Sequence, residues 1–155
     1  MDMKTEINSS IKKALSLKDE EKYNESSELI KKIILNHPNH SKILPLKVVL
    51  SGNYYNLKEY KKSIDYSTEV LSTGKKSELS SLLIYLSYIE LNQPKNAFDT
   101  LFCYLENHPA NLFKDTLEEL LDGLLDGFGL KYKDKIIYFA NKNNIGKKKD
   151  DNGTD

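Results

Sequence analysis

Histidine is the side chain in this sequence best suited to hold a metal ion or to act as a general base. The motif NHP occurs at 36–38 and again at 107–109, and His40 follows the first copy closely. A zinc site would need His37, His40 and a third ligand, but the second copy belongs to a distant part of the chain. Each copy follows an apolar run typical of a helix, and proline cannot continue a helix beyond its last turn. We therefore interpret both copies as helix ends, and we expect no metal site and no cofactor.

The other reactive side chains lie in patterns that have ordinary structural explanations. Cys103 falls within the apolar run AFDTLFCYL, so we expect a small buried side chain rather than a nucleophile. No glycine-rich phosphate loop and no grouping of serine, histidine and aspartate can be assembled, so we expect a protein that is not an enzyme. Four carboxylates on one helix-like stretch indicate a solvated acidic face. They are Glu118, Glu119, Asp122 and Asp126.

Composition excludes several classes of partner. The 155 residues carry 23 basic and 23 acidic side chains, so no net charge attracts nucleic acid or an anionic membrane. The most apolar stretch, LLIYLSYIEL at 82–91, is too short to cross a bilayer, and the first residues do not resemble a secretion signal. A single cysteine allows no internal disulfide. We therefore expect a cytoplasmic protein whose partner is neither nucleic acid nor a membrane.

Apolar side chains recur at spacings of three and four residues, which is typical of amphipathic helices, and strand-like alternation is absent. Short helices bury their apolar stripes only by packing on one another, so the pattern predicts a single all-α domain over 1–145. The tail at 146–155 has nothing apolar to bury, and we expect it to be disordered. The predicted helices cover 6–18, 20–36, 43–56, 58–73, 78–91, 93–107, 112–126 and 131–143.

The chain also aligns with itself when it is shifted by 37 residues and when it is shifted by 34 residues. Such self-similarity is typical of repeat proteins, in which each unit packs on its neighbours. Together the two shifts define three units, at 7–40, 44–77 and 78–111. The first shift places Ala14 over Ser51, Leu17 over Tyr54 and Ser26 over Ser63, and the second places Tyr54 over Tyr88 and Ser63 over Ala97.

The middle unit resembles the tetratricopeptide repeat, in which each unit forms two antiparallel helices. The resemblance lies in the stretch LSGNYYNLKEYKKSIDYSTEVL, where the small side chains Ser51 and Ser63 would let two helix axes approach closely. It implies a right-handed superhelical stack of three helix-turn-helix repeats, followed by capping helices at 112–143. The third unit departs from the pattern, because Tyr85 stands where a small residue is usual.

In this family the first helix of each repeat lines a concave groove, and the implied wall is mostly apolar here. Leaving such side chains in water forgoes roughly 1.5 to 3 kcal/mol each. Three occupants of the groove stay open: the chain's own helices at 112–143, a second copy in a homodimer, or a segment of a partner protein. If a partner binds, Leu82 and Leu86 would be its central anchors. The implied wall consists of Ile11, Leu15, Val48, Gly52, Tyr55, Leu79, Leu82, Leu86 and Ile89.

The function implied by the resemblance is protein binding. The chain would be an adaptor or scaffold that holds an apolar or amphipathic segment of another protein or peptide in its groove. One alternative is a dedicated holding chaperone for a secretion or assembly substrate, because small bacterial chaperones of that kind have a similar length and three repeats. The other alternative is the regulatory subunit of an enzyme.

Overall fold

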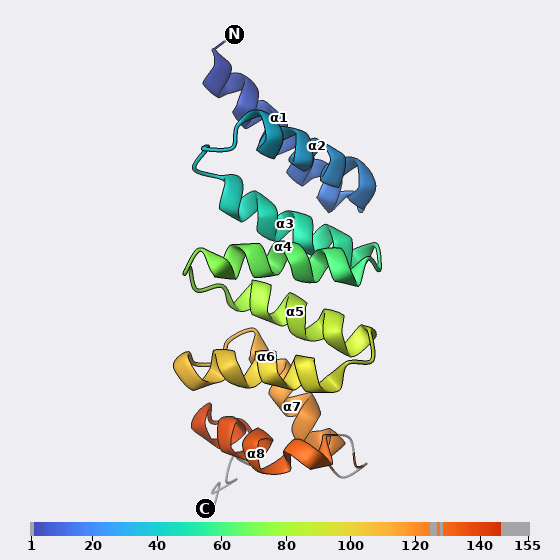
Figure 1. Ribbon diagram of the computed structural model, residues 1–155, viewed down its shortest axis with the longest axis vertical. Coiled ribbons are helices and arrows are strands. Elements are labelled where there is room, and N and C mark those ends of the chain that lie inside the picture. Colours follow the sequence, from blue (N-terminus) through green and yellow to red (C-terminus); the bar gives the residue numbers. More distant parts are fainter. Residues whose placement is uncertain (1, 125–126, 128, 147–155) are drawn as a thin grey trace, which may run out of the picture. The chain divides into compact units, whose positions relative to one another are not determined.

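The protein is all-α in the computed structural model, which describes residues 2–124, 127 and 129–146. Within these residues there is no strand, which confirms the prediction of an all-α protein, and no helix is long and apolar enough to cross a membrane. The right-handed superhelical stack stays a prediction. The α-helices are α1 (Met3–Asp19), α2 (Tyr23–Asn36), α3 (Ile43–Asn56), α4 (Tyr60–Ser72), α5 (Glu78–Glu90), α6 (Pro94–Asn107), α7 (Phe113–Gly123) and α8 (Lys133–Lys142), with a short 3-10 helix at Leu130–Tyr132 (Figure 1).

Two compact units make up the chain, Met1–Thr100 and Leu101–Asp155. In the first unit the helices pack in chain order, α1 on α2, α2 on α3, α3 on α4 and α4 on α5 (Figure 1). In addition, α3 contacts α5 directly, so these two helices lie side by side. The expected single domain over 1–145 stays a prediction, and the predicted tail lies outside the described residues apart from Gly146.

The same tight turn ends three helices of the first unit. Glu21, Lys58 and Asn92 have left-handed φ angles of 60°, 61° and 55°. Glu21 and Lys58 are 37 residues apart, and Lys58 and Asn92 are 34 apart. These are the two shifts at which the sequence aligns with itself. Because this turn closes α1, α2 begins at Tyr23 and not at residue 20 as predicted. In each turn the residue after the left-handed one donates its backbone N–H to the carbonyl five residues earlier, at 2.8 Å. The pairs are Lys22 to Leu17, Glu59 to Tyr54 and Gln93 to Tyr88.

Small side chains stand where the paired helices meet. The Ser26 hydroxyl on α2 donates to the carbonyl of Ala14 on α1 at 2.8 Å, and the Ser51 hydroxyl on α3 donates to the carbonyl of Ser63 on α4 at the same distance. Ser63 and Ala97 are each the fourth residue of their helix and have no exposed surface. Since a hydroxyl reaches the backbone of the facing helix, a large side chain at these positions would push the helices apart.

The core of the first unit begins at these contacts and continues between α1, α2 and α3. The buried Asn53 side chain donates from Nδ2 to the Ser26 hydroxyl at 3.0 Å, which links α3 to the α1–α2 pair. Around this polar link the core is apolar. It consists of Ile7, Ile11, Ala14, Ile30, Ile33, Leu46, Leu50 and Tyr54.

The second unit has an aromatic core of its own. The rings of Phe102 and Phe139 stack with centroids 5.5 Å apart, and their planes differ by 16°. The Asn143 side chain accepts the backbone N–H of Ala110 at 2.8 Å, which fixes the end of α8 to the segment before α7. An aromatic stack and a polar link therefore join distant segments of this unit.

Cys103 is exposed, so its predicted burial is wrong. In this part of α6 the two residues before Cys103 and the two after it are buried, and all four have larger side chains. Cys103 falls between them, on the opposite side of the helix. The four are Leu101, Phe102, Tyr104 and Leu105.

Replacing Ser63 by Leu should lower the free energy of unfolding by about 1 to 3 kcal/mol, because the added atoms must displace the backbone of α3. The matched control is Thr68→Leu, an exposed position on the same helix, which should change stability by less than about 0.5 kcal/mol. Urea unfolding followed by circular dichroism measures both. Equal stability of the two variants would contradict the close helix contact.

Candidate functional site

The predicted wall residues fall into two groups in the structure. Ile11 is 4% exposed and belongs to the core of the first unit, so it offers little surface to a ligand. Leu15 is half-buried and packs against the same core. The remaining residues lie on two neighbouring helices, and we call them the α3–α5 wall. They are Val48, Gly52 and Tyr55 on α3, and Leu79, Leu82, Leu86 and Ile89 on α5.

The two rows of this wall meet at one end. On α5, Leu82 and Leu86 are one turn apart, and Glu90 follows one turn later on the same face. Glu90 lies close enough to Tyr55 on α3 for its charge to raise the pKa of the tyrosine, after the larger effect of burial. α3 and α5 also contact each other, so the two rows lie on neighbouring helices.

Most of the wall is only partly covered. Val48, Tyr55, Leu82 and Leu86 are half-buried, and the Leu79 side chain is 43% exposed. Apolar side chains in this state still present surface to water, and that surface becomes favourable to cover when a ligand binds. The wall therefore has the chemistry expected of a surface that binds an apolar segment.

Gly52 interrupts the wall without a structural reason in the described residues. It lies inside α3, its φ angle is not positive, and a Cβ added there would meet no atom within 4 Å. Glycine inside a helix costs about 0.8 to 1.0 kcal/mol relative to alanine. The missing side chain leaves the backbone of α3 accessible between Val48 and Tyr55, so a ligand can approach it closely.

An aromatic and acidic cluster closes the end of the wall. The rings of Tyr55 and Tyr60 lie edge to face, with centroids 5.5 Å apart and an interplanar angle of 61°. The Tyr60 hydroxyl, at the start of α4, donates to the Glu90 carboxylate at 3.4 Å. Burial first, and then the negative charge of Glu90, raise the pKa of Tyr60. We call these three residues the Tyr–Glu cluster.

Sequence reasoning identified Tyr55 but missed Tyr60 and Glu90. The signal for Glu90 was present, since it follows Leu86 by four residues and Leu82 by eight. Tyr60 could not be found in this way, because it belongs to α4 and reaches the wall only through the turn that Lys58 makes.

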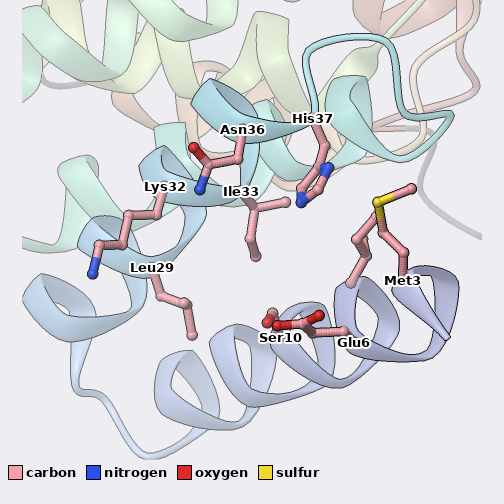
Figure 2. A pocket seen from close by; sticks show the side chains of 9 residues that line it. Met3, Glu6, Ser10, Leu29, Lys32, Ile33, Asn36 and His37 are labelled. Carbon is pink, nitrogen blue, oxygen red and sulfur yellow. The ribbon is translucent and has the colours of Figure 1, made fainter. Parts of the chain in front are cut away.

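A separate pocket of about 350 Å³ lies between α1 and α2. Figure 2 shows Ile33 and the His37 ring extending from α2 toward α1, where Glu6 and Ser10 lie. Serine, histidine and glutamate are the side chains of a nucleophilic triad, but such a triad needs hydrogen bonds between them. In the described part of the chain none of the three is bonded to another, so this pocket contains no assembled catalytic group.

The two NHP motifs lie at helix ends, as predicted, with Asn36 the last residue of α2 and Asn107 the last residue of α6. The backbone N–H of His37 donates to Ile33 at 2.9 Å and that of His108 to Tyr104 at 3.0 Å, so both histidines take part in the last turn of their helix. Across the described residues, no three His, Cys, Asp or Glu side chains come close enough together to hold a metal ion. The acidic residues Glu118 and Asp122 are exposed, and Asp126 lies outside the described residues.

Comparisons of the chain with models of protein families, with curated protein sequences and with solved structures give no match. Function must therefore be inferred from the geometry and chemistry of the α3–α5 wall and its surroundings.

Replacing Gly52 by Ala should raise the free energy of unfolding by about 0.5 to 1 kcal/mol, since alanine favours the helix and its methyl group has room. Gly74→Ala is the matched control. Its Cβ would also meet no atom within 4 Å, but its φ of 79° disfavours any side chain, so this variant should be less stable. Thermal and urea unfolding compare the two. A loss of stability in Gly52→Ala would mean that the wall is covered at α3.

The free energy of unfolding should decline less steeply above pH about 10 in Glu90→Gln than in the unmodified chain. Unfolded tyrosines titrate at about pH 10, whereas the pKa values of folded Tyr55 and Tyr60 are raised. As pH rises between the two values, the unfolded state loses its proton first, so stability that is complete below pH about 10 is progressively lost. The tyrosines remain buried in the variant, but the charge of Glu90 is gone. The difference between the folded and unfolded pKa values of the tyrosines is therefore smaller. Urea unfolding at pH about 9 and about 11 measures this, and equal slopes would contradict it.

Proposed function

We propose that this chain is a protein–protein interaction module of the tetratricopeptide type, which binds an apolar or amphipathic segment of a partner protein on the α3–α5 wall. The repeated turn at Glu21, Lys58 and Asn92 supports the repeat assignment, because it recurs at the two shifts of the sequence alignment. The buried fourth residues of α4 and α6, Ser63 and Ala97, support it as well.

The observation that carries the proposal is Gly52, a helix-interior glycine that faces open space in the middle of a half-buried apolar wall. A fold selected only for stability would favour alanine there. A binding surface has a different requirement, because a bound segment can pack closely against the helix backbone where a side chain is missing. Gly52 therefore supports binding at this place over a purely structural role for α3.

The leucines of α5 provide the apolar part of the binding energy. Fully burying a leucine side chain is worth about 1.5 to 3 kcal/mol, and Leu82 and Leu86 are half-buried before any partner binds. Their spacing of one turn matches the spacing of apolar residues on an amphipathic helix, which binds in grooves through positions i, i+3 or i+4, and i+7. A helical partner segment with an apolar stripe would fit this wall.

Under this proposal the protein catalyses no reaction and binds no cofactor. It acts in the cytoplasm, and its partner is neither nucleic acid nor a membrane. The choice of partner rests on the neutral charge balance of 23 basic and 23 acidic residues and on the apolar character of the wall.

Replacing Leu86 by Glu should abolish binding of a partner segment while leaving the melting temperature nearly unchanged. Glutamate is a good helix former, and on an open wall its charge stays in water. Leu35→Glu is the matched control, because Leu35 on α2 is 79% exposed and lies outside the wall. Thermal melting and a binding assay are measured on both variants.

A large fall in melting temperature for Leu86→Glu alone would contradict the open wall. It would mean that the charge is buried, at a cost of several kcal/mol, by another part of the chain such as 112–143 or by a second copy. Melting measured over a range of protein concentrations separates these two cases, because only a dimer melts at a temperature that depends on concentration.

A further inference from the structure

We propose that the Tyr–Glu cluster binds a lysine or arginine side chain of the partner segment, so that the wall recognises apolar residues followed by a basic one. This inference rests on the proposed function, because the cluster closes the end of the α3–α5 wall. It adds the chemistry of the partner, which an apolar wall alone does not define.

The cluster combines the two groups that bind an ammonium or guanidinium ion. Glu90 provides a carboxylate, and Tyr55 and Tyr60 provide ring surfaces, which attract cations through their quadrupole. The two rings lie edge to face with centroids 5.5 Å apart, and the Tyr60 hydroxyl donates to the Glu90 carboxylate, so the aromatic rings and the carboxylate are adjacent. A cation next to Glu90 can therefore contact the carboxylate and an aromatic ring together.

Within the described residues, no lysine of the chain neutralises Glu90. In the described residues its one hydrogen bond comes from the Tyr60 hydroxyl, and no lysine forms an ion pair with it. Several other glutamates have such partners: Glu59 pairs with Lys62, and Glu69 pairs with Lys47 at 3.0 Å. An exposed carboxylate beside an apolar surface thus remains available for a ligand cation.

The lysines near Tyr60 do not fill this position. Lys62 pairs with Glu59 and lies over the Tyr54 ring, 5.0 Å from its centroid. Lys58, Lys61 and Lys62 line a cavity of about 300 Å³ together with Glu59, Tyr60 and Leu91, but within the described residues none of the three lysines forms an ion pair with Glu90.

The position of the cluster sets the spacing within the ligand. Glu90 is one turn beyond Leu86, which is about 6 Å along the helix axis. A segment whose apolar side chains cover Leu82 and Leu86 would place its basic side chain roughly one helical turn further on. We therefore expect an amphipathic ligand with a lysine or arginine about one turn from its apolar anchors.

The experiment selects short peptides of random sequence on the immobilised full chain and measures their affinity by fluorescence anisotropy. The selected peptides should carry Lys or Arg at a constant distance from two or more apolar residues. Glu90→Lys should weaken their binding by about five- to tenfold or more. Asp65→Lys is the matched control, because Asp65 is exposed on α4 and the change in charge is the same, and it should leave binding unchanged.

A charge reversal makes the test specific. A selected peptide whose basic residue is replaced by Glu should bind Glu90→Lys more tightly than it binds the unmodified chain. Peptides that need Leu86 but bind Glu90→Lys and the unmodified chain equally would overturn the role of the cluster while leaving the proposed function intact. Peptides that ignore Leu86, or a complete failure to select any, would overturn the proposed function itself.

One further variant tests whether basic residues of the chain itself bind to the Tyr–Glu cluster. The sequence continues beyond Gly146 with Lys147, Lys148 and Lys149. If a chain that ends at Gly146 binds the peptides much more tightly than the full chain, these lysines compete for the cluster, and the assignment to a partner is overturned. Equal affinity of the two chains supports the assignment to a partner.

Discussion

The close approach of paired helices at small side chains is the constraint on which the rest of the first unit depends. Ala14 faces Ser26, and Ser51 faces Ser63, with a hydroxyl-to-carbonyl hydrogen bond of 2.8 Å in each pair. A buried hydroxyl without a partner would cost about 1 to 3 kcal/mol, so the bond stabilises only one relative placement of the two helices. The left-handed turn at Lys58 then fixes the direction in which the next helix starts. α5 packs on α4 and also contacts α3, which places the two apolar rows on neighbouring helices.

Local features of the fold could be predicted from the sequence, while features that join distant segments mostly could not. Helical periodicity located α3 at 43–56, as the structure has it, because that signal lies within one element. Burial of Cys103 was predicted wrongly, because an apolar run indicates a helix but not which of its sides faces the core. Within the candidate site, Tyr55 followed from the alignment of repeats. Helical spacing places Glu90 in line with Leu82 and Leu86, but Tyr60 and Glu90 meet Tyr55 through the packing of α4 and α5 on α3, which no local pattern encodes.

The wall contains one feature that stability alone does not explain, namely a glycine inside a helix. Alanine would be the more stable choice at Gly52, because it favours the helix and its methyl group has room. Departures of this kind from local consistency are expected where a surface serves binding. The pocket between α1 and α2 has no comparable feature. Its polar side chains, such as Glu6 and Lys32, lie at an open surface where solvent already satisfies them.

The most direct test of the account is a nuclear magnetic resonance titration of the full chain, labelled at the methyl groups of Leu, Ile and Val, with an amphipathic peptide that it binds. Methyl shifts report contact residue by residue and do not depend on any substitution. Binding on the α3–α5 wall predicts that the largest changes occur at Val48, Leu82 and Leu86 and that they saturate together. Changes confined to Ile7, Leu29 and Ile33 would place the ligand in the pocket between α1 and α2 and would contradict the central claim.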